Sequence, residues 1–154
     1  MNEPLPAAAP LPTGVAEGFE LNIFGWPWTG LVTLLALLIV FVLALQVSRA
    51  RKIYGVPSPL CTGPDDFMRV LYVHVHAVKC LVLFLPLLWM TAFATKDEIA
   101  AAIGVFWPLS AISYALAYYK DAKKGSAAIT LGVVVLVILF AVSAIQIVRS
   151  LFIW

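Results

Sequence analysis

Four long apolar segments, separated by short polar or proline-containing stretches, dominate the chain. No charged residue occurs between Leu21 and Val47, nor between Ile99 and Tyr119. About 20 apolar residues are enough for a helix to cross the hydrocarbon core of a bilayer. The pattern therefore predicts four membrane-spanning helices, at about 27–52, 65–95, 98–122 and 126–150.

Proline and glycine mark the ends of these helices. The connection 53–64 holds three prolines and two glycines, which predicts a rigid, non-helical loop. Asp65 and Asp66 then bring negative charge to the start of the second helix, where the helix dipole favours it. Pro86 and Pro108 fall inside the second and third helices, where a kink is tolerated because neighbouring helices support the backbone.

The second helix carries a polar stripe, which consists of Arg69, Tyr72, His76 and Lys79. Spacings of three, four and three place these residues on one helical face. A charge such as Lys79 costs roughly 2.5–3.5 kcal/mol in lipid on insertion scales, so it should face protein, water or a ligand. Two interpretations stay open: the stripe holds helices together, or it lines a binding site between helices.

The composition agrees with a membrane protein. Hydrophobic residues make up 63% of the chain, charged residues only 12%, and the mean hydropathy is +1.01. A soluble domain is usually nearer half apolar. We expect one membrane domain at 26–154, preceded by a Pro- and Ala-rich arm at 1–25. The net charge of +2 is too small to predict nucleic acid as a partner.

The cysteines and histidines do not form a metal-binding pattern. Cys61 and Cys80 match no CxxC motif, and a thiol in an apolar helix is usually a small packing residue. His74 and His76 are two positions apart, so on a helix they point about 200° away from each other. We therefore expect no metal ion.

The distribution of basic residues predicts the orientation of the helices. Seven basic residues flank the first and third connections, and two flank the opposite side. Cytoplasmic loops are enriched in Lys and Arg, so both termini are predicted on the non-cytoplasmic side. Short connections favour an antiparallel four-helix bundle. The seven basic residues at the first and third connections are Arg49, Arg51, Lys52, Arg69, Lys120, Lys123 and Lys124. The two on the opposite side are Lys96 and Arg149.

The first connection carries a recognisable signature. Basic residues close the first helix, V-x-x-P follows at 56–59, and T-G-x-x-x-F-x-R opens the second helix at 62–69. This arrangement resembles the family of membrane-associated proteins in eicosanoid and glutathione metabolism (MAPEG). The resemblance continues to about residue 150. It implies a four-helix subunit, a homotrimer, and glutathione sites between neighbouring subunits.

Five positions match residues that the resemblance assigns to glutathione binding or to the motif. Arg51 and Lys52 fall where family transferases place basic residues near the glutathione carboxylates and thiol. Tyr114 and Tyr118 match two tyrosines of the third helix, and Arg69 matches the arginine of the loop motif. The resemblance thus implies glutathione as the cofactor.

The polar stripe departs from the family. Where glutathione-using members carry Arg, Asn and Glu, this chain has Tyr72, His76 and Lys79, and a Gln of one branch is His74. The arginine that stabilises the thiolate falls at Gly125. Lys79 would repel the ammonium group that the family's glutamate receives. A thiol also needs nearby positive charge to ionise near neutral pH, and Gly125 supplies none, although the basic residues Lys52, Lys123 and Lys124 are candidates.

These changes favour a degenerate glutathione site. The first prediction is a non-catalytic protein that binds lipid, or a structural or accessory subunit of a larger membrane complex docked through the arm and Trp26 and Trp28. The alternative is a glutathione-dependent transferase or peroxidase acting on lipophilic electrophiles, with Arg51, Lys52, Tyr114 and Tyr118 holding the cofactor.

Overall fold

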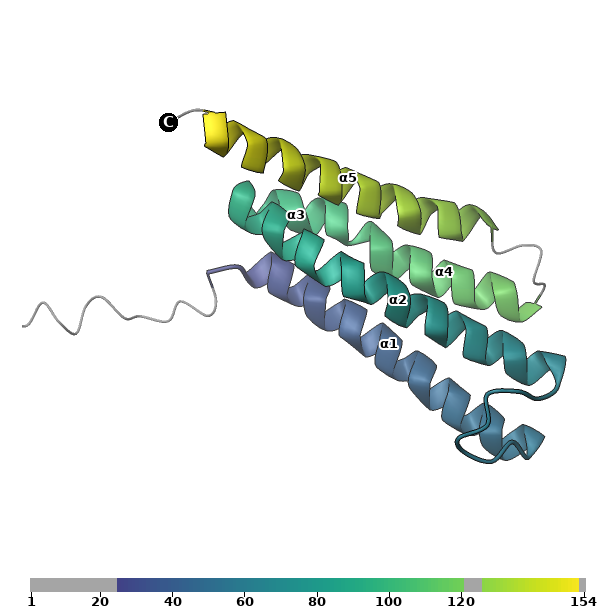
Figure 1. The fold of residues 1–154 in the computed structure, drawn as a ribbon. Helices are drawn as coiled ribbons and strands as arrows, with labels where there is room; N and C mark the ends of the chain where they lie inside the picture. The colour runs from purple at the N-terminus through teal and green to yellow at the C-terminus, as the bar shows by residue number, and fades with distance from the viewer. Residues whose placement is uncertain (1–24, 121–125, 153–154) are drawn as a thin grey trace, which may run out of the picture.

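The chain folds into an all-helical bundle. The computed structural model describes residues 25–120 and 126–152, so the predicted N-terminal arm, Lys123, Lys124 and Gly125 lie outside the described residues. Four helical spans are long and apolar enough to cross a membrane, and the described residues contain no strand. This confirms the predicted all-α, integral membrane four-helix architecture. The first helix begins and the last helix ends at the same end of the bundle (Figure 1). The helices are α1 (Pro27–Tyr54), α2 (Asp65–Ala94), α3 (Asp97–Gly104), α4 (Phe106–Lys120) and α5 (Ser126–Phe152).

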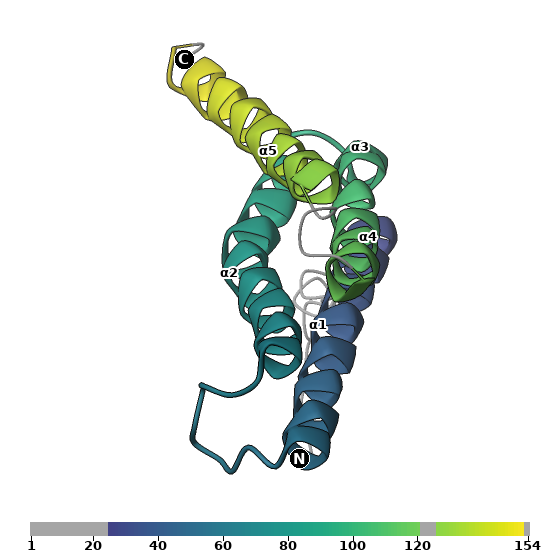
Figure 2. The ribbon, with the colours of Figure 1, turned by 90° about the vertical axis from the view of Figure 1, so that its right-hand side faces the viewer.

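The helices form an open arrangement rather than a closed ring. Helix α2 packs against every other helix, whereas no Cα atom of α1 lies within 8 Å of a Cα atom of α5 in the described residues. Figure 2 shows α5 at the top of the bundle and the long part of α1 at the bottom. Many large apolar side chains on α1, α2 and α5 are therefore exposed, as expected for helices in lipid.

The third span differs from the single helix expected over 98–122, because it is divided into α3 and α4. The division follows from Pro108, which has no N–H to donate to the carbonyl of Gly104 and whose ring crowds that carbonyl. The next hydrogen bond, from Leu109 N–H to Val105 O, is long at 3.5 Å. Pro86 leaves α2 continuous.

The core is centred on an aromatic stack between α2 and α4. The rings of Phe84 and Trp107 lie 4.5 Å apart and nearly parallel, at 14°, and both are almost fully buried. Leu88 packs beside them, and a Cβ added to Gly104 would come within 2.5 Å of its Cδ1. Glycine at this position therefore allows α3 to approach α2 closely.

A buried carboxylate joins α1 to α3. Asp97, at the first position of α3, accepts hydrogen bonds from the backbone N–H of Trp28 at 2.9 Å and of Thr29 at 2.7 Å. The N-cap residue of α1, Trp26, makes no side-chain capping bond, so Asp97 satisfies donors that the helix leaves open. The negative charge also lies where the α1 dipole favours it.

Candidate functional site

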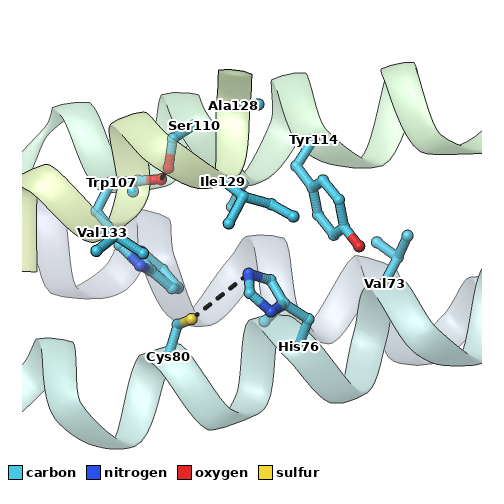
Figure 3. Close-up of a pocket in the computed structure, with 12 residues that line it drawn as sticks. Val73, His76, Cys80, Trp107, Ser110, Tyr114, Ala128, Ile129 and Val133 are labelled. Atoms are coloured by element: carbon cyan, nitrogen blue, oxygen red, sulfur yellow. Dashed lines mark hydrogen bonds between the residues drawn. The ribbon is translucent and has the colours of Figure 1, made fainter. Parts of the chain in front are cut away.

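A small cavity lies inside the bundle between α2, α4 and α5. His76 and Cys80 point into it from α2, Trp107 and Tyr114 from α4, and Val133 from α5 (Figure 3). Its volume of about 20 Å³ holds a single water molecule. Glutathione is many times larger. A glutathione molecule would therefore have to bind on an outer face of the subunit.

Two of the predicted site residues, His76 and Tyr114, line the cavity, and a third, Tyr118, lies beside Tyr114. The His76 ring lies 5.0 Å from the ring of Tyr114, which lies 5.3 Å from that of Tyr118. The Nε2 atom of His76 is 3.6 Å from the sulfur of Cys80. The apolar surroundings in the sequence predict that Cys80 is a packing residue, although its spacing of four from His76 on one helix is the signal that pairs them.

Two residues of the polar stripe lie elsewhere. Tyr72 is 60% exposed and Lys79 is also exposed, and neither lines the cavity. At about 100° per residue, Tyr72 and Lys79 lie about 40° and 60° around α2 from His76. Both are displaced away from Val73, which faces the core. The polar stripe is therefore wide enough for His76, at one edge, to enter the bundle while Tyr72 and Lys79, at the other edge, face outward.

Arg51 is engaged by the loop that follows α1. Its Nη1 atom donates to the carbonyls of Leu60 at 2.6 Å and Pro57 at 3.4 Å, and its guanidinium lies 5.4 Å from the centre of the Phe67 ring. These contacts tie the loop to both helices, with Gly55 ending α1 in the left-handed conformation (φ 64°). A residue predicted to bind glutathione thus has a structural role.

The two remaining basic candidates lie near the same end of the bundle. Lys52 is exposed on the last turn of α1. Arg69 forms an exposed ion pair with Asp66, with the nitrogen and oxygen 3.4 Å apart, within the first turns of α2. Neither lines the cavity. Within 25–120 and 126–152, no three His, Cys, Asp or Glu residues gather in a way that could hold a metal ion.

We expect Arg51→Ala to loosen the loop without unfolding the bundle. The amide of Leu60, which bonds to the Pro57 carbonyl, should exchange about tenfold faster because the guanidinium no longer holds both carbonyls. Hydrogen exchange read by mass spectrometry measures this change. Arg49→Ala, an exposed substitution two residues earlier, is the matched control. Equal exchange in both variants would contradict the structural role of Arg51.

Comparison with known proteins gives the family. The model of the MAPEG family matches residues 29–145. An uncharacterized protein of Synechocystis is 43% identical over 105 residues, which is 68% of this chain and 77% of that protein. Leukotriene C4 synthase of Cavia porcellus is 35% identical over 92 residues, 60% of this chain and 61% of the synthase. Microsomal glutathione S-transferase 2 of Bos taurus is 30% identical over 107 residues, 70% of this chain and 73% of the transferase. The loop signature, the four spans and these matches agree: the chain belongs to the MAPEG family.

Proposed function

We propose that this protein is a non-catalytic MAPEG member that binds an anionic lipophilic ligand on the outer face of α2. We define this outer face by Tyr72, Val75, Lys79 and Val82, all of which are exposed. The observation that carries the proposal is the position of Lys79. It lies on an exposed apolar surface near the middle of α2, and no ion pair within the described ranges includes it.

An unpaired lysine at this depth calls for an anion. Lys79 follows Asp65 by 14 residues, or ~21 Å along the helix. A lysine in lipid is costly, and residues of this kind usually pair with another group or line a polar path. A long-chain carboxylate would place its charge at Lys79 and its hydrocarbon along Val75 and Val82. The pair would be stronger than in water, because the surroundings have a low dielectric constant.

Several features argue against a working glutathione site. Lys79 would repel the ammonium group of the tripeptide, and Arg51 already binds two carbonyls of its own loop. The cavity that His76 and Tyr114 line is too small for a tripeptide. These observations support a degenerate site.

A second candidate is a glutathione-dependent transferase or peroxidase. The names of two groups of relatives, leukotriene C4 synthase and microsomal glutathione S-transferase 2, favour it. Exposed Lys52 and the pair Tyr114 and Tyr118 are the groups that would hold the cofactor at an interface between subunits. The homotrimer and the non-cytoplasmic termini both stay predictions, which chemical cross-linking and accessibility of added tags would test.

Binding measurements on the purified protein in lipid nanodiscs separate the two candidates. We expect a fluorescent long-chain fatty acid to bind, and Lys79→Met to weaken binding at least about tenfold because the ion pair is lost. Lys96→Met is the matched control, because it removes an exposed lysine charge just after the C-terminal end of α2. Equal affinity of the wild type and the Lys79→Met protein for the fatty acid would contradict the lipid proposal.

Glutathione titration of the same samples completes the comparison. Saturable micromolar glutathione binding that is lost in Lys52→Ala would favour the enzyme. Improved glutathione binding in Lys79→Glu would show that only the stripe has diverged. If the protein binds neither the fatty acid nor glutathione and co-purifies with another membrane protein, the result would favour a role as an accessory subunit.

A further inference from the structure

Cys80 and His76 form a thiol–imidazole pair on the inner side of α2. They are one turn apart, and Nε2 of His76 lies 3.6 Å from the sulfur. Figure 3 shows both side chains pointing into the cavity, toward Trp107 and Ile129. A thiol within reach of an imidazole is the arrangement that activates a cysteine as a nucleophile.

The surroundings determine what can reach the sulfur. The cavity is lined mainly by apolar and aromatic groups, and no carboxylate, lysine or arginine lines it. Cys80 is half-buried, and Val133 at the α5 edge is 47% exposed on the outer surface of the bundle. Uncharged molecules would reach the sulfur from the bilayer past Val133. Charged reagents are excluded by the cost of entering lipid.

We propose that Cys80, with His76 as its base, is a reactive thiol that adds to small α,β-unsaturated carbonyl compounds dissolved in the membrane. The inference is independent of the lipid and glutathione proposals, because it uses only the chain's own thiol and a cavity that neither proposal requires. It also gives a use to a cavity too small for glutathione. A space that holds one water molecule takes only the β-carbon next to the sulfur, so the rest of the molecule would lie over Val133.

The reaction is a conjugate addition. As the sulfur forms a bond to the β-carbon, the thiol proton moves to Nε2 of His76 and the electrons of the carbon–carbon double bond move toward the carbonyl, giving an enolate. His76 then returns the proton to the α-carbon. The product is a saturated carbonyl compound joined to Cys80 by a thioether. No atom is lost, and no oxidant or reductant is required.

The second cysteine provides an internal control. Cys61 is exposed in the α1–α2 connection, and its sulfur lies 3.4 Å from the carbonyl of Pro59. Among the described residues, the histidine hydrogen-bonded to a cysteine is His76, and its partner is Cys80. Cys61→Ser leaves Cys80 as the single thiol, and Cys80→Ser leaves Cys61. The two variants compare a thiol paired with imidazole in the membrane with an unpaired thiol in a loop.

The test exposes each single-thiol protein, in nanodiscs, to trans-2-hexenal and measures adducts by intact mass. We expect the Cys80 protein to gain one adduct at least about tenfold faster than the Cys61 protein. A charged, membrane-impermeant maleimide should show the opposite preference. His76→Gln in the Cys80 protein should slow the addition of hexenal at least about tenfold.

A second variant tests the inference independently, in case the His76→Gln protein does not fold. Val133→Trp keeps both Cys80 and His76 and covers the edge of the cavity from a lipid-exposed position, so it should also slow the addition. Thermal unfolding verifies the fold of each variant. The inference is overturned if Cys80 reacts no faster than Cys61, or if neither His76→Gln nor Val133→Trp changes the rate of a folded protein.

Discussion

Trp107→Ala is expected to lower the free energy of unfolding by about 4 kcal/mol, the largest effect of any substitution considered. Trp107 is 2% exposed and stacks on Phe84, which is fully buried. Alanine would remove this stack and leave a void between α2 and α4. Leu88 and Leu139, which belong to the same cluster, cannot fill the void without moving whole helices. Reversible unfolding in mixed detergent micelles measures the loss.

The matched control for this substitution is the preceding residue. Phe106→Ala removes another large aromatic ring from α4, but this ring is 50% exposed to lipid and outside the stack. It should change the unfolding free energy by less than about 1 kcal/mol. Trp107→Phe, which keeps an aromatic ring on Phe84, should have an intermediate effect. If Trp107→Ala and Phe106→Ala cost the same, the aromatic stack does not stabilise the core.

Asp97→Ala is expected to cost about 3 kcal/mol. The substitution removes two charge-assisted hydrogen bonds, to the N–H groups of Trp28 and Thr29, and leaves these donors unsatisfied. Asp97 is 8% exposed, so water replaces its oxygens poorly. Asp97→Asn should cost less, because the amide oxygen still accepts one bond. The same unfolding assay applies.

Glu98 supplies the control for the buried carboxylate. It follows Asp97 directly, is exposed, and carries the same charge in the first turn of α3. Glu98→Ala should change the unfolding free energy by no more than about 0.5 kcal/mol. A similar loss for Glu98→Ala and Asp97→Ala would mean that the helix dipole of α3, and not the contact with α1, accounts for the effect.

The spans could be predicted from the sequence because their causes are local. Hydrocarbon requires long apolar helices, and clustered prolines and glycines interrupt them. The division between α3 and α4 could not be predicted in this way. Pro86 and Pro108 look alike in the sequence, yet only Pro108 lies next to a helix break, at Val105. Whether a proline interrupts its helix depends on how the neighbouring helices pack against the backbone around that proline.

The candidate site was predictable only in part, for the same reason. The helical period groups His76 with the stripe, but whether a residue at the edge enters the bundle depends on the rotation of α2 against its neighbours. Tyr72 and Lys79 face outward because Val73 and Ala77 fix that rotation. The resemblance predicts a ligand for Arg51, whereas its bonds to the carbonyls of Pro57 and Leu60 have no pattern in the sequence that would predict them. The role of Asp97 has no local signal in the sequence, because its two partners are 68 and 69 residues away.

The distance between Asp97 and its partners has a consequence for biosynthesis. A chain is synthesised from its N-terminus, so all of α1 is made 43 residues before Asp97 is added to the chain. Until then the first turn of α1 has no carboxylate to accept its open N–H groups, and headgroup water must serve instead. The start of the first helix therefore acquires its final anchor only when the third span arrives, so its settling is a late event in the assembly of the bundle.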